Sequence, residues 1–114
     1  MKNKRTLKRR QLVYYFKVFI NNTDILAGKL VDITHEGLML VNKQILDIGE
    51  IFPLRILLNE KQQSAEYLDL LAECRWVRPD SSSGHHLMGF QFVELSENQR
   101  LAITRLILEY RLDD

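Results

Sequence analysis

Alternation of apolar and polar side chains with a period of two, repeated along most of the chain, is the feature that most restricts the fold. Successive side chains of a β-strand point to opposite faces of a sheet, so this alternation predicts strands. The links between them are short and rich in turn-forming residues, as in Asn21-Asn22-Thr23-Asp24. Parallel strands need long crossover connections, so we expect antiparallel pairs. The predicted strands are residues 12–20, 25–33, 38–41, 51–58, 65–78 and 87–93.

The fifth predicted strand has apolar residues on alternate positions, and they share one face. These residues are Leu68, Leu70, Ala72, Cys74 and Trp76. We expect this face to point into the core. The single cysteine, Cys74, is expected to be a buried apolar thiol, because it has no disulfide partner and no metal-binding spacing. Trp76 is expected to lie in the core with it.

One helix is predicted after the strands. Ser96-Glu97-Asn98-Gln99 fits a capping box, in which the serine oxygen accepts a hydrogen bond from the amide three residues later and the glutamine reaches back. Apolar residues then recur three and four positions apart, as on the buried face of a helix. Because closure removes exposed strand edges, we expect an all-β fold, a six-stranded antiparallel β-barrel with one C-terminal α-helix. This domain is expected to span residues 12–114, with its helix starting at about residue 96.

Positive charge is concentrated at the N-terminus. The formal net charge is +1, yet the first ten residues contain six basic side chains and no acidic one. The other ten basic residues are outnumbered by fifteen acidic ones, so a basic arm, residues 1–11, precedes a mildly acidic domain. We expect this arm to be flexible and to bind an anion, since it carries few apolar side chains. A solvated tail without a ligand is the alternative.

Several classes of protein find no support in the sequence. No apolar run approaches the roughly 18 residues that a membrane span requires, and we expect a cytoplasmic protein. His35, His85 and His86 stand in no spacing typical of a catalytic nucleophile or of a metal site. No phosphate-binding glycine loop occurs either. We therefore expect no enzyme, no metal site and no cofactor.

The segment Asp32-Ile33-Thr34-His35-Glu36-Gly37 is the second candidate for function. Asp32 and Thr34 are two positions apart, so they project to the same face of an extended backbone. A carboxylate and a hydroxyl on one face can accept the N–H edge of a guanine, and Gly37 allows a turn or a close approach. An ordinary strand-end turn is the alternative.

Two short motifs occur in a fixed order along the chain. Arg5-Thr6-Leu7-Lys8-Arg9 has the form RxxxR, and the segment from Asp32 to Gly37 has the form DxSxxG with threonine in place of serine. With Gly89-Phe90-Gln91-Phe92 and the helix opening at Ser96, these motifs resemble the PilZ domain family. Members of that family are receptors for the bacterial second messenger cyclic di-GMP. The resemblance covers nearly the whole chain.

The resemblance implies cyclic di-GMP as the ligand. A guanidinium fork matches a phosphate or the O6/N7 edge of guanine, so the motif arginines would hold the ligand while Asp32 and Thr34 contact guanine. Arg10 would add a contact, or serve as the second motif arginine instead of Arg9. The implied ligand-binding residues are Arg5, Arg9, Arg10, Asp32, Thr34 and Gly37.

Ligand binding is expected to order the arm and to change the surface that a partner protein meets. For Trp76, stacking on a base of the ligand is the alternative to burial in the core. Two other functions stay open. One is a degenerate PilZ domain that acts as a protein-interaction module without nucleotide. The other, less favoured, is a binder of single-stranded nucleic acid, which the acidic remainder of the chain opposes.

Overall fold

The structure, a computed structural model, describes residues 16–59 and 66–110. These residues form six strands and one helix in the predicted order. The elements are β1 (Lys17–Ile20), β2 (Leu26–Ile33), β3 (Gly37–Asn42), β4 (Ile51–Asn59), β5 (Glu66–Pro79), β6 (His86–Phe92) and α1 (Glu97–Tyr110). Residues 12–15 of the first predicted strand, residue 65 of the fifth and the basic arm lie outside the described residues.

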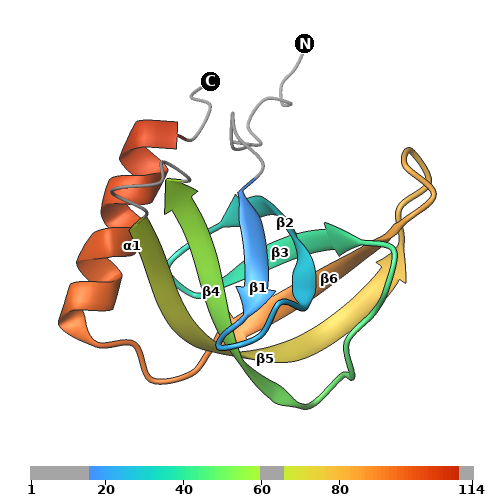
Figure 1. Ribbon diagram of the computed structural model, residues 1–114, viewed down its shortest axis with the longest axis horizontal. Helices are drawn as coiled ribbons and strands as arrows, with labels where there is room; N and C mark the ends of the chain where they lie inside the picture. Colours follow the sequence, from blue (N-terminus) through green and yellow to red (C-terminus); the bar gives the residue numbers. More distant parts are fainter. Residues whose placement is uncertain (1–15, 60–65, 111–114) are drawn as a thin grey trace, which may run out of the picture.

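The strands close into a barrel in the order β1-β2-β3-β6-β5-β4, and every neighbouring pair is antiparallel. Figure 1 shows α1 against one side of this barrel and the hairpin between β5 and β6 projecting from the opposite side. The predicted six-stranded antiparallel barrel with a C-terminal helix is therefore confirmed. Closure gives each strand two neighbours, so the short strand β1 pairs with both β2 and β4.

The core consists of the inward-facing apolar residues of all six strands, joined by two residues of the helix. Cys74 is fully buried among them, as predicted. On α1, Ile103 and Leu106 expose 0% and 2% of their surface, so the helix is anchored by the apolar stripe that the sequence predicts. The buried strand residues include Val18, Leu30, Leu40, Leu54, Ile56, Leu70 and Met88.

The helix begins with the predicted capping box. The Gln99 amide donates to Ser96 Oγ at 3.1 Å, and the Ser96 amide donates to Gln99 Oε1 at 2.7 Å. The same glutamine donates through Nε2 to the Asp69 carbonyl at 2.8 Å. One side chain therefore both caps α1 and ties its start to β5.

The expectation that Trp76 lies in the core is wrong. Strand pairing shifts here, because Cys74 pairs with Phe90 and Trp76 pairs with Gly89. Arg75 is consequently an extra residue, a β-bulge, and it interrupts the period of two. Trp76 turns to the outside of the barrel and is 37% exposed, whereas Cys74 two positions earlier remains buried.

Candidate functional site

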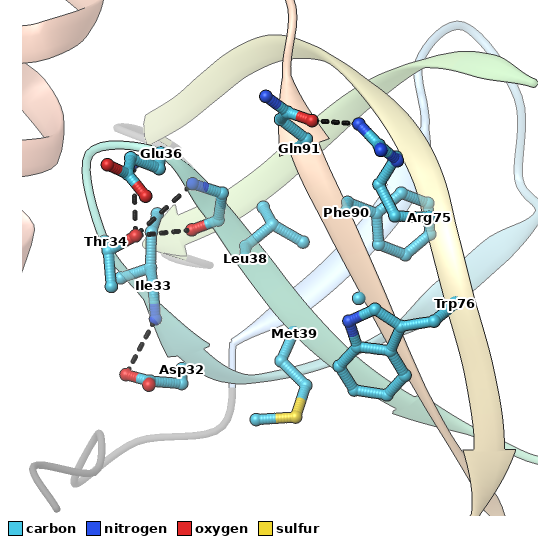
Figure 2. Close-up of a pocket in the computed structure, with 12 residues that line it drawn as sticks. Asp32, Ile33, Thr34, Glu36, Leu38, Met39, Arg75, Trp76, Phe90 and Gln91 are labelled. Atoms are coloured by element: carbon cyan, nitrogen blue, oxygen red, sulfur yellow. Dashed lines mark hydrogen bonds between the residues drawn. The ribbon is translucent and has the colours of Figure 1, made fainter. Parts of the chain in front are cut away.

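A groove of about 330 Å³ lies on the outer surface of the barrel, where the turn between β2 and β3 meets β5 and β6. Figure 2 shows the Asp32 to Glu36 segment on one side of it and Arg75 and Trp76 on the other. We call it the motif groove. Its lining residues are Asp32, Ile33, Thr34, Glu36, Gly37, Leu38, Met39, Arg75, Trp76, Gly89, Phe90 and Gln91.

Asp32 is half-buried near the end of β2, where its position follows from a second irregularity in the barrel. The pairing of β2 with β3 shifts between Leu30 and Asp32. The next residue, Ile33, is fully buried, and its amide donates to Asp32 Oδ1 at 2.9 Å. The buried neighbour and this hydrogen bond hold the carboxylate at the mouth of the motif groove (Figure 2).

Thr34 organises the turn that follows. Its amide donates to the Gly37 carbonyl at 2.9 Å, which closes the turn. Its Oγ1 accepts hydrogen bonds from the amides of Glu36 at 3.1 Å and Gly37 at 3.3 Å. Threonine supplies the same hydroxyl as serine, so the turn is formed with threonine at this motif position. Thr34 itself is exposed at the rim of the groove.

Gly37 begins β3 and is required by the close approach of another strand. A Cβ atom at this position would collide with the carbonyl oxygen of Phe90 on β6. The sequence alone is compatible with two roles for Gly37, in a turn or in a close approach. The structure supplies the second reason, and the approaching group is the protein's own backbone.

His35 connects this turn to the helix. Its Nε2 lies 2.7 Å from Oγ1 of Thr104 on α1, and Thr104 Oγ1 donates to the Arg100 carbonyl at 3.0 Å. Because the threonine proton is used on that carbonyl, His35 Nε2 is the donor. The DxSxxG segment is therefore joined to α1 by one side-chain hydrogen bond.

Trp76 forms part of the wall of the groove by lying against a glycine. A Cβ atom on Gly89 would collide with the indole ring, so the ring lies directly on the β6 backbone at this point. The guanidinium carbon of Arg78, two positions along β5, is 4.7 Å from the ring centroid. Trp76 thus presents a partly exposed aromatic surface beside the motif residues.

Sequence reasoning missed Arg75, Glu36 and Gln91 as residues of the groove. Arg75 Nη1 donates to Gln91 Oε1 across β5 and β6. The bulge that turns Arg75 and Trp76 outward together leaves no local signal in the alternating pattern. Gln91 stands in the Gly-Phe-Gln-Phe segment, which is the one signal that pointed to this part of β6.

A wider hollow of about 840 Å³ adjoins the motif groove and shares Asp32 and Met39 with it. Val31 and Leu87 are among its apolar lining residues, and Lys29, Arg78 and Asp80 bring charges of both signs to it. The two hollows therefore meet at Asp32 and Met39.

Of the predicted ligand residues, the structure brings Asp32, Thr34 and Gly37 together in the motif groove. Arg5, Arg9 and Arg10 lie outside the described residues. Within residues 16–59 and 66–110, no helix has the length and apolar content to cross a membrane. In the same ranges, no three metal-ligating side chains gather into a metal site.

Comparisons with known proteins agree with this fold. The family described as "PilZ domain" matches residues 3–109. The structure of the Bacillus subtilis inhibitor of motility (MotI/DgrA) is similar with a TM-score of 0.66 at 19% identity, over 89% of this chain and 50% of that one. The PilZ domain of YcgR from Escherichia coli, solved with c-di-GMP, is similar with a TM-score of 0.63 at 14% identity, over 88% and 86% of the two chains.

This chain spans half the length of the MotI/DgrA chain. At these levels of identity, the two structures share the fold with this chain. The comparison with curated proteins gave no match.

Proposed function

This chain belongs to the PilZ domain family, and from that premise we propose that it is a receptor for cyclic di-GMP. The observation that carries the proposal is the motif groove, in which Asp32 and Thr34 of the DxSxxG segment line one side and the partly exposed ring of Trp76 lines the other (Figure 2). Acceptor groups next to an aromatic surface are suited to a guanine base, which offers N–H donors on its edge and a stacking face. The YcgR domain of the same fold was solved with this ligand.

Guanine recognition is assigned to the barrel side of the site. The Asp32 carboxylate accepts hydrogen bonds from the guanine N1–H and N2–H groups, which adenine lacks. Trp76 stacks on a base. The Arg78 guanidinium, which lies over the ring, is then either displaced or stacked together with the base. The adjoining hollow on the other side of Asp32 offers room for the rest of a dinucleotide.

Phosphate recognition is assigned to the basic arm. Arg5 and Arg9, with Arg10 as an additional contact or as the second motif residue, bind the phosphates or the O6/N7 edges of the guanines. Binding orders the arm over the barrel and thereby changes the surface offered to a partner protein. The proposed receptor is cytoplasmic and non-enzymatic and transmits its signal through that protein contact.

Isothermal titration of the full 114-residue chain tests this proposal, with cyclic di-AMP as the matched control ligand. We expect cyclic di-GMP to bind in the micromolar range, about −8 kcal/mol, and cyclic di-AMP to bind at least tenfold more weakly. Hydrogen exchange at residues 5–10 should slow when cyclic di-GMP is added. The absence of binding at millimolar cyclic di-GMP would overturn the receptor function.

A protein-interaction module without nucleotide is the competing function. The observation that favours it is the outer face of α1, where Leu101 and Leu108 expose 58% and 78% of their surface. These two leucines stand seven positions apart, on one face of the helix. The same titration decides between the two functions, because only the receptor binds cyclic di-GMP.

A further inference from the structure

The charges of the motif groove are unbalanced for an anionic ligand. Two of its lining residues, Asp32 and Glu36, carry carboxylates, and among the described lining residues Arg75 alone carries a positive charge. A cyclic dinucleotide has two phosphates, which the carboxylates repel and a guanidinium attracts. Among the described residues of this groove, Arg75 is therefore the positively charged partner for a phosphate.

Arg75 is placed there by the β-bulge. As the extra residue between Cys74 and Trp76, it turns to the outside of the barrel at the same point as Trp76. Figure 2 shows its guanidinium beside Gln91, on the side of the groove opposite Thr34 and Glu36. An aromatic surface for a base and a cation for a phosphate thus come from consecutive residues of β5.

The partner of Arg75 is an amide and not a carboxylate. Its Nη1 donates to Gln91 Oε1, and within residues 16–59 and 66–110 it forms no ion pair. The neutral glutamine fixes the direction of the guanidinium while leaving its charge uncompensated. A guanidinium has five N–H donors in a planar fork, so one hydrogen bond to Gln91 leaves donors for an oxyanion.

We propose that Arg75 is a further arginine of the ligand site, outside both motifs, and that it binds a phosphate oxygen of the ligand while Gln91 positions it. This inference rests on the proposed binding of cyclic di-GMP. It divides the site by chemistry: the carboxylate side receives the guanine edge, and the β5 bulge supplies a base-stacking ring and a phosphate contact.

The test is titration of cyclic di-GMP into wild-type protein and into Arg75→Gln, Arg75→Lys, Gln91→Leu and Arg105→Gln. Arg105 is an exposed arginine of α1 outside the groove, so its variant is the control for loss of one positive charge. Arg75→Gln should weaken binding about tenfold or more, since it removes a charge-assisted contact. Arg75→Lys should be intermediate, because it keeps the charge without the fork, and Arg105→Gln should stay within twofold.

Gln91→Leu should weaken binding severalfold. Adding Arg75→Gln to Gln91→Leu should then weaken binding by less than Arg75→Gln does in the wild type, as expected if Gln91 acts through Arg75. Circular dichroism should be unchanged for every variant, because the three side chains that are replaced lie at the outer surface. Wild-type binding with Arg75→Gln within twofold of it would overturn this inference and leave the receptor function standing. An Arg75→Lys protein as weak as Arg75→Gln would place the contact on a base edge and overturn the phosphate assignment. If the wild type does not bind, the receptor function fails and this inference with it.

Discussion

Two places on the outer surface of the barrel combine an arginine with an aromatic ring, and they differ in how the arginine is compensated. On β4 and β5, Arg55 lies 4.4 Å from the ring centroid of Tyr67 and makes two hydrogen bonds to Asp69, at 2.7 and 2.8 Å. In the motif groove, Arg75 stands beside Trp76 and its partner is the neutral Gln91.

The guanidinium of Arg55 is neutralised within the protein, whereas that of Arg75 is left for a ligand. The bidentate carboxylate uses the fork of Arg55 within the protein, and it lowers the pKa of Asp69 below its usual value, chiefly through the Arg55 hydrogen bond. Arg75 keeps its charge for a ligand because an amide cannot neutralise it. Arginines on two neighbouring strands thus differ in role: Arg55 serves surface structure, and we propose that Arg75 serves recognition.

The largest effect is expected from the N-terminal arm. Arg9→Ala should weaken cyclic di-GMP binding more than about hundredfold, because it removes a bidentate, charge-assisted contact. Arg55→Ala should leave the affinity unchanged, since its fork is occupied by Asp69. Titration with circular dichroism as a check on folding measures both. Unchanged affinity of Arg9→Ala would move the second motif arginine to Arg10.

A smaller loss is expected when Trp76 is pushed off β6. Gly89→Ala places a Cβ where the indole ring lies, so the ring must rotate and its stacking surface is lost. We expect about tenfold weaker binding, in line with the value of one base–aromatic stack. Trp76 is the single tryptophan, so its fluorescence reports the displacement directly and should also change when wild-type protein binds ligand.

The matched variant for this prediction is Gly37→Ala. Its Cβ would meet the backbone of Phe90, which cannot rotate away. Gly37→Ala should therefore lower the melting temperature, whereas Gly89→Ala should leave it nearly unchanged. Equal melting temperatures of the two variants would contradict the assignment of side-chain displacement to one and backbone collision to the other.

The ion pair of Arg55 and Asp69 should contribute little to the melting temperature or to cyclic di-GMP affinity. Asp69→Asn removes an ion pair whose side chains are 35% and 44% exposed, and exposed pairs contribute little to stability. The melting temperature should fall by less than about 5 °C, and cyclic di-GMP affinity should not change. A Tyr67→Leu variant controls for the ring contact of Arg55. A large loss of binding in Asp69→Asn would contradict the assignment of Arg55 to surface structure and of Arg75 to ligand binding.

The smallest expected effect is the pH dependence of the stability that the Arg55–Asp69 pair contributes. Since Asp69 has a lowered pKa in the folded protein, its stabilising contribution is complete above the ordinary carboxylate pKa of about 3.9 and is lost as pH falls through the folded value. The difference in denaturation midpoint between wild type and Asp69→Asn should therefore be constant from pH 7 to 5 and shrink in more acidic solution. A difference that grows on acidification would contradict this sign.

The sequence predicted the order of the elements along the chain, the capping box and the position of Asp32 and Thr34 on one surface, because each depends on local periodicity or on spacing within a few residues. The barrel was predicted from the need to cover strand edges. The position of Trp76 was not predictable in this way. A β-bulge adds one residue to a strand, and the period of two continues on either side without marking the insertion. What favours the bulge is non-local, since the ring needs Gly89, a residue without a side chain on the neighbouring strand.

Arg75 and Gln91 were not predicted as groove residues for the same non-local reason. Their contact joins two strands across the bulge, and no spacing along the chain encodes it. For the arginines of the basic arm, the sequence motif is the source of the prediction, and Arg5, Arg9 and Arg10 stay predictions.

Closure of the barrel limits how this domain can meet another protein. In the described part of the chain every strand has a hydrogen-bonded neighbour on both sides, and unpaired strand edge is confined to segments such as the parts of β5 that pair with β4 alone or with β6 alone. Recognition by β-augmentation, in which main-chain hydrogen bonds supply affinity with little regard to sequence, is thereby restricted to these segments. Elsewhere on the barrel a partner contacts side chains, and its specificity is therefore open to change by single substitutions on the outer faces of the barrel and α1.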